Sequence, residues 1–233
     1  MDFQNISEAI REKRIKRIKL LGDSITHGVG GTDCAMDGEI IVDDFSRNPN
    51  GYCWAKLFKE HLQEKYGCAV VNNACSGTTI QFILQHFDTL VDEEDDLIIC
   101  TIGTNNRHQD KKTGAKKSRE EFGESFYNYI LQLNNIFQKK GKNVIFVSNI
   151  PAASNCEQDG QEFWRILHMD DINHIYKAAH AKAGFLFISL FDLFTEYLLT
   201  ADETVDENLK DGLHPNDKGY RVIFELLCNA LQI

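Results

Sequence analysis

Five short apolar runs, separated by longer amphipathic segments, constrain the fold of this chain more than any other feature. The runs cover residues 18–21, 69–71, 96–102, 143–150 and 184–189. Near-continuous apolar runs of this length are typical of strands that are buried on both faces of a sheet. Their alternation with helical segments therefore predicts a three-layer α/β/α fold built around a five-stranded parallel sheet.

The segments between the runs carry apolar residues at helical spacing. Helices are expected over residues 52–66, 118–140, 170–183 and 215–231. Pro215 suits the first turn of the last helix, where a missing N–H costs nothing. The chain has 233 residues, with no internal repeat and no stretch of linker composition, so we expect one domain over residues 1–233.

The charge of the chain argues against a nucleic-acid partner. The net charge is −10, whereas phosphate binding needs a clustered basic surface. Six basic residues lie between Arg11 and Lys19, and we expect them to form a solvated lead-in to the first strand. The acidic run over residues 92–96 is expected to be a solvated loop before the third strand.

The cysteines predict neither a disulfide framework nor a zinc site. There are seven of them, an odd number, and none is spaced as CxxC. Such thiols are typical of a reducing cytosol. The N-terminal residues lack the apolar core of a signal peptide, and no apolar stretch approaches the roughly 20 residues that span a bilayer. We therefore expect a cytoplasmic protein with no membrane span.

Polar turns follow three of the predicted strands. Ser24 comes after the first strand, Gly77 after the second and Asn105 after the third, while Asp211 and His214 precede the last helix. The carboxyl ends of parallel strands meet at one edge of a sheet, and α/β proteins bind their ligands there. The sequence therefore predicts that these residues belong to one site.

The sequence around these residues resembles the SGNH, or GDSL-like, hydrolase family. Four blocks carry the resemblance in the family's order: GDSIT at 22–26, NACSGT at 73–78, GTNN at 103–106 and DGLHP at 211–215. The blocks extend over nearly the whole chain. The resemblance implies the flavodoxin-like SGNH hydrolase fold and a serine ester hydrolase. Asn106 departs from the family pattern, which often has aspartate there, and this puts in doubt any hydrogen bond that the aspartate would make.

The resemblance implies a role for each matched residue. Ser24 would be the nucleophile, His214 its base, and Asp211 the residue that orients the imidazole ring. The oxyanion would be bound by the backbone N–H groups of Ser24 and Gly77 and by the side-chain amide of Asn105. Glycine lets a backbone amide approach the substrate without a clashing Cβ atom. This chemistry needs no metal ion and no organic cofactor.

Three neighbouring features have weaker signals. Asp23 is expected to brace the turn before Ser24 rather than to react. His27 is interpreted either as a wall of the acyl pocket or as a surface histidine at its mouth. The charged segment 107–117 is expected to be a mobile loop at the edge of the site.

The expected substrate is a small-molecule ester with a polar alcohol part. The insertion over residues 30–51 is polar and acidic, whereas a fatty chain needs an apolar groove. We therefore favour short acyl esters, such as acetyl esters of a carbohydrate. A lysophospholipase or thioesterase acting on longer acyl chains, an acyltransferase, and a non-catalytic ligand-binding module are the alternatives. The oligomeric state is left open.

Overall fold

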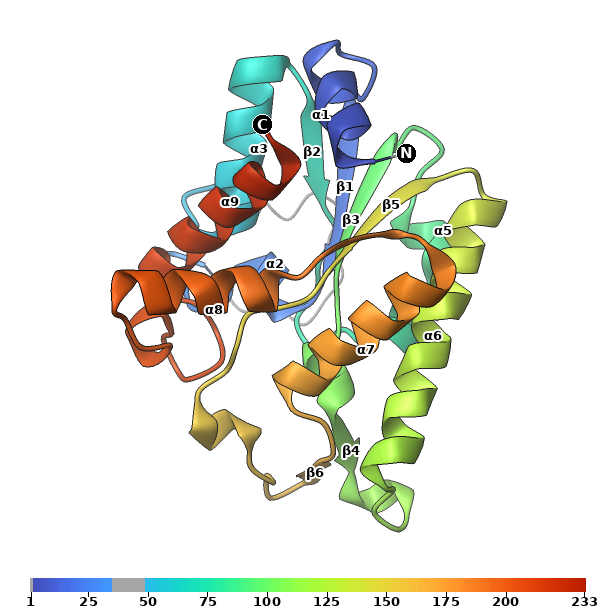
Figure 1. Cartoon of the computed structure of the whole chain (residues 1–233), viewed down its shortest axis with the longest axis vertical. Coiled ribbons are helices and arrows are strands. Elements are labelled where there is room, and N and C mark those ends of the chain that lie inside the picture. Colours follow the sequence, from blue (N-terminus) through green and yellow to red (C-terminus); the bar gives the residue numbers. More distant parts are fainter. Residues whose placement is uncertain (1, 35–48) are drawn as a thin grey trace.

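The computed structural model describes residues 2–34 and 49–233, and its centre is a parallel sheet (Figure 1). The strands are β1 (Arg17–Gly22), β2 (Ala69–Asn72), β3 (Leu97–Thr101), β5 (Asn143–Val147) and β7 (Leu186–Ile188). They lie in the order β2-β1-β3-β5-β7, and every neighbouring pair is parallel. This is the flavodoxin-like order, so the predicted fold class is confirmed.

Helices cover both faces of the sheet, and each face has its own apolar core (Figure 1). One face packs against α1 (Phe3–Arg11), α3 (Trp54–Tyr66), α8 (Leu190–Ala201) and α9 (Asp217–Leu231). The other packs against α4 (Ile80–Gln85), α5 (Phe87–Leu90), α6 (Arg119–Lys139) and α7 (Met169–Ala183). Successive strand side chains point to opposite faces, so Leu20 contributes to the first core and Leu21 to the second.

The last helix begins later than predicted. Pro215 is not in its first turn but lies before it, where it forms an isolated bridge with Leu209. The helix begins at Asp217 because the side chain of Asn216 caps it, accepting a hydrogen bond from the backbone N–H of Gly219 at 3.0 Å.

The predicted mobile loop over residues 107–117 is wrong in part. Its first residues form β4 (His108–Asp110), which pairs antiparallel with β6 (Phe163–Arg165). The Gln109 side chain is buried and closes the rest of the segment, donating to the Ala115 carbonyl and accepting from the Lys117 N–H, both at 3.0 Å. The ribbon of β4 and β6 projects beyond the ends of the sheet strands (Figure 1).

The predictions of a solvated basic lead-in and a solvated acidic run are right for most of their residues, which are exposed, but wrong where the two segments pair. Lys19 is fully buried in β1, and its Nζ atom lies 2.9 Å from Asp92 Oδ2 and 3.5 Å from Asp95 Oδ2. Arg17 pairs with Asp92 at 2.8 Å and with Glu94 at 2.9 Å. Arg17 and Lys19 meet the acidic run because β1 and the start of β3 are adjacent in the sheet.

Two further sequence features can be compared with the structure. All seven cysteines lie in the described residues, and none of them is in a disulfide. Within residues 2–34 and 49–233, no helix is both long and apolar enough to cross a membrane. The greater part of the acidic insertion, residues 35–48, lies outside the described residues.

Candidate functional site

The predicted site residues follow strands that lie at the point where the strand order reverses. The chain passes from β1 to β2 on one side of the sheet, and then returns to β3 on the other side of β1. Ser24 opens the short helix α2 (Ser24–His27) directly after β1, and Asn105 lies in the 3-10 turn η2 (Thr104–Arg107) that follows β3. In open parallel sheets the crevice at this reversal is where ligands bind.

Ser24 is held at the start of α2 by its neighbours. The carboxylate of Asp23 caps the helix, accepting a hydrogen bond from the backbone N–H of Ile25 at 3.0 Å. Gly28 ends the helix in the left-handed conformation, with φ of 112°. These two ends fix the backbone on either side of the Ser24 hydroxyl.

Ser24, His214 and Asp211 form one hydrogen-bonded row. The Ser24 Oγ atom lies 2.9 Å from His214 Nε2, and His214 Nδ1 lies 2.8 Å from Asp211 Oδ2. The structure thus brings together three predicted residues that are separated by up to 190 positions. The His214 side chain keeps 16% of its surface exposed, so the row opens to solvent.

Asp211 is fixed by the turn that separates it from His214. Its Oδ1 atom accepts the backbone N–H groups of Leu213 at 3.0 Å and His214 at 2.8 Å. Partial burial would raise the pKa of this carboxyl, but the hydrogen bonds from His214 and Leu213 outweigh it and hold the pKa below its usual value. Asp211 is therefore a carboxylate that can orient an imidazole ring.

The turn that contains Gly77 is hydrogen-bonded to the side chain of Asn105. The Thr78 N–H donates to the Cys75 carbonyl at 3.2 Å, which places Gly77 at the third position of the turn with φ of +80°. The side-chain amide of Asn105 donates one N–H to the Thr78 carbonyl at 2.9 Å. A primary amide has two N–H groups, so Asn105 retains a second donor.

A buried polar network ties the strand ends together beneath these residues. Asn149, two residues after the end of β5, donates to Asp23 Oδ2 at 3.1 Å and also to the hydroxyl of Thr104. Asp23 is fully buried, which raises the pKa of its carboxyl. Asp23 braces the turn, as predicted. The roles of Asn149 and Thr104 were not predicted, although each is a polar residue that follows a buried strand.

Comparison with known proteins identifies the family. The model of the GDSL-like Lipase/Acylhydrolase family matches residues 20–222 of this chain. This chain belongs to the GDSL-like lipase/acylhydrolase family. It is accordingly an enzyme of the carboxylic ester hydrolase class. No curated protein sequence matches it.

Solved structures share the fold of this GDSL-like hydrolase at low sequence identity. Axe2, an acetylxylan esterase from Geobacillus stearothermophilus, is 20% identical, with a TM-score of 0.69 and 94% of each chain covered. LAE5, an α/β hydrolase enzyme from the metagenome of Lake Arreo in Spain, is 18% identical, with a TM-score of 0.68 and 93% and 95% covered. A GDSL-like lipase from Parabacteroides merdae is 14% identical, with a TM-score of 0.66 and 94% and 96% covered.

Two residues of this GDSL-like hydrolase answer questions that the sequence left open. Asn106 Oδ1 accepts the backbone N–H of Ile80 at 3.0 Å, and its amide donates to the Gln81 side chain at 2.7 Å. It therefore retains an acceptor of the kind that an aspartate would offer. His27 is only 2% exposed, so the interpretation as a surface histidine at the mouth is wrong.

Proposed function

We propose that this GDSL-like hydrolase cleaves carboxylic esters through an acyl intermediate on Ser24. The row from Ser24 through His214 to Asp211 carries the proposal. A neutral hydroxyl attacks an ester poorly and needs an adjacent base. The 2.9 Å between Ser24 Oγ and His214 Nε2 is within the range for direct proton transfer.

The reaction proceeds in two balanced halves. Ser24 Oγ bonds to the ester carbonyl carbon as its proton passes to His214 Nε2. The C–O bond to the alcohol then breaks, and His214 returns the proton to the leaving oxygen. In the second half a water gives one proton to His214 and bonds to the acyl carbon, after which the bond to Ser24 breaks and Ser24 regains the proton. Asp211 stabilises the imidazolium in both halves.

The oxyanion of each tetrahedral intermediate is assigned to the backbone N–H groups of Ser24 and Gly77 and to the Asn105 amide. Two observations support the assignment. Thr78 fixes the Asn105 amide through one N–H, so the other is already oriented before substrate arrives. Gly77 is exposed at the tip of its turn, which leaves its backbone open to a ligand. Preorganised donors of this kind account for a large share of catalysis in acyl transfer.

The catalytic variants of a structural neighbour are consistent with these roles. Catalytic mutants of Axe2 replace a serine, an aspartate and a histidine, and the last two are three positions apart in its sequence. Asp211 and His214 have the same spacing here. The proposed serine, aspartate and histidine are thus of the same residue types as in that enzyme. The aspartate and the histidine also have the same spacing.

We propose short acyl groups, acetyl above all, on a polar or carbohydrate alcohol. The side chains at the site itself are polar, among them Asn105, His214 and Asp211. A long acyl chain needs an apolar groove instead. Axe2, which shares the fold, is an acetylxylan esterase.

A chain-length series tests the proposal. With p-nitrophenyl esters, kcat/KM is expected to be about tenfold or more higher for acetate than for octanoate, because each methylene that a site cannot accommodate costs binding energy. Ser24→Ala serves as the control for spontaneous hydrolysis. A maximum at octanoate would reject the short-acyl preference, and hydrolysis no faster than with Ser24→Ala would reject the esterase mechanism.

Gly77→Ala is expected to lower kcat by about 10-fold or more while costing about 1–2 kcal/mol of stability. A Cβ atom at Gly77 meets none of the described residues within 4 Å, so a loss of activity would arise from contact with substrate or from movement of the N–H donor. Gly67→Ala is the matched control, because Gly67 also has positive φ and open space but ends α3. Equal activity losses in both variants would contradict the role of Gly77. The measurements are thermal unfolding and steady-state kinetics.

A further inference from the structure

Arg107 is a fully buried cation beside the proposed oxyanion donor. It lies two residues after Asn105, in the same turn η2, and its side chain has no exposed surface. Burial lowers the pKa of Arg107 to about 10, so the group remains charged near neutral pH. A buried charge is tolerated only when partners compensate for the lost water. The chemistry proposed for Ser24 does not use it.

The guanidinium joins two separate turns. Its Nε atom donates to the Thr104 carbonyl at 3.0 Å, on the residue that precedes Asn105. Its Nη1 atom donates to Glu157 Oε2 at 2.8 Å, in the 3-10 turn η4 (Ser154–Glu157). Glu157 is itself fixed, because its Oε1 atom accepts the backbone N–H of Met169 at 3.0 Å. Arg107 therefore connects the turn that carries Asn105 to η4.

The η4 turn also supports the loop that carries Asp211 and His214. The Ala153 N–H, at the start of η4, donates to the Gly212 carbonyl at 2.8 Å. The Cys156 thiol donates to the Asp211 carbonyl at 3.6 Å. The packing is close, since a Cβ atom on Gly212 would lie 2.8 Å from Asn155 Oδ1. A movement of η4 would thus move Asp211 and, with it, His214.

We propose that Arg107 is a positioning residue for the esterase reaction. Through Thr104 on one side and Glu157 on the other, it sets the separation between the Asn105 donor and the His214 base. It touches neither substrate nor the reacting atoms. The inference rests on the proposed function of Ser24, His214 and Asn105. Its physical basis is that a displacement of catalytic groups by about 1 Å can cost about 10²-fold in rate.

The test compares Arg107→Met, Arg107→Lys and Glu157→Gln with p-nitrophenyl acetate. Arg107→Met is expected to lower kcat by about 10²-fold while KM changes less than about threefold, because ground-state binding does not involve this residue. Lysine offers one compact ammonium in place of a planar fork, so Arg107→Lys is expected to recover only part of the loss. Glutamine at 157 keeps an acceptor for Met169 and removes the charge. The double variant Arg107→Met/Glu157→Gln is expected to be no slower than Arg107→Met.

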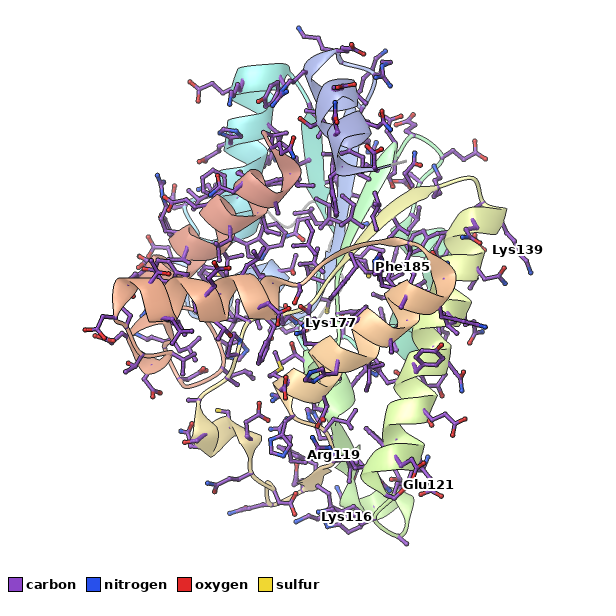
Figure 2. The ribbon with its side chains drawn as sticks, in the orientation of Figure 1. Lys116, Arg119, Glu121, Lys139, Lys177 and Phe185 are labelled. Carbon is purple, nitrogen blue, oxygen red and sulfur yellow. The ribbon has the colours of Figure 1, made fainter. Side chains whose placement is uncertain are left out.

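A control tests whether the loss of an arginine–carboxylate pair away from the site also lowers kcat. Arg119 also pairs with an acidic residue across the chain, donating from Nε to Asp171 at 3.0 Å. Figure 2 shows Arg119 at the beginning of α6, reaching toward the beginning of α7. Arg119→Met is expected to keep wild-type kcat. If Arg107→Met fails to fold, Arg107→Lys and Glu157→Gln carry the test.

Chemical rescue gives a further measurement, the kcat with added guanidinium, which a purely structural role of Arg107 would leave unchanged. Arg107→Ala leaves a hole of the shape of the lost group, and millimolar guanidinium is expected to restore part of its kcat, whereas Arg119→Ala gains nothing. Wild-type kcat in folded Arg107→Lys and Glu157→Gln would overturn the positioning role. Failure of the wild type to hydrolyse the ester or to react with a serine-directed phosphonate at Ser24 would instead reject the proposed function itself.

Discussion

Replacing Ser24 by alanine is expected to lower kcat/KM for p-nitrophenyl acetate by about 10⁴-fold or more. The loss is this large because the hydroxyl forms the covalent bond to the acyl group, and no other group in the row can take its place. His214→Ala is expected to cost a similar factor, since without the base the hydroxyl is a poor nucleophile. Residues that act as one unit are not additive, so the double variant is expected to be no slower than either single variant.

The measurement is steady-state kinetics together with mass spectrometry of phosphonate-treated protein. Wild type is expected to gain one phosphonyl group on Ser24, and both single variants are expected to gain none. Ser125→Ala is the control: its hydroxyl donates to the Glu121 carbonyl within α6, away from the row. Label on another residue of the wild type would show that Ser24 is not the nucleophile. A double variant much slower than both single variants would show that Ser24 and His214 do not act as one unit.

The layers of the fold and the centre of the site could be predicted because they depend on local patterns. The run 96–102 is apolar at four successive positions, 97–100, and a strand covered on both faces needs such a near-continuous pattern. The ends of such strands then place Ser24 and Asn105 at one edge, whatever the details of packing. Asp211 and His214 are close in sequence, so one turn fixes their relative positions. The backbone N–H groups of that turn donate to Asp211.

The features that could not be predicted depend on contacts between distant segments. The segment that forms β4 has no apolar alternation of its own, and it is a strand because β6 pairs with it 55 residues later, His108 opposite Arg165 at one end and Asp110 opposite Phe163 at the other. Arg107 belongs to a charged segment and reads as a surface residue until Glu157 is brought beside it. Charge alone does not reveal whether a partner lies elsewhere in the chain.

Lys19→Met is expected to lower the free energy of unfolding by about 3 kcal/mol. The Lys19 ammonium is fully buried in the central strand β1, and it is shared by Asp92 and Asp95. The side chain of Asp95 is also fully buried, so removal of the cation leaves it with less compensation. Methionine fills a similar volume, so lost packing alone would not explain the decrease in the free energy of unfolding. Urea denaturation at neutral pH is the measurement.

The matched control is Lys140→Met, which breaks an ion pair with Asp88 at 2.7 Å in which both side chains are more than half exposed. An exposed pair contributes about 0–1 kcal/mol, so this variant is expected to stay near wild type. Equal losses of stability in the two variants would contradict a buried network.

The pH dependence of stability gives a second check. The hydrogen bond from Lys19 holds the pKa of Asp92 below its ordinary 3.8, so its contribution is complete above that pH and is lost as the pH falls through the lower, folded-state value. The stability difference between wild type and Lys19→Met is therefore expected to narrow with acidification, because protonation of Asp92 removes the same interaction that the substitution removes.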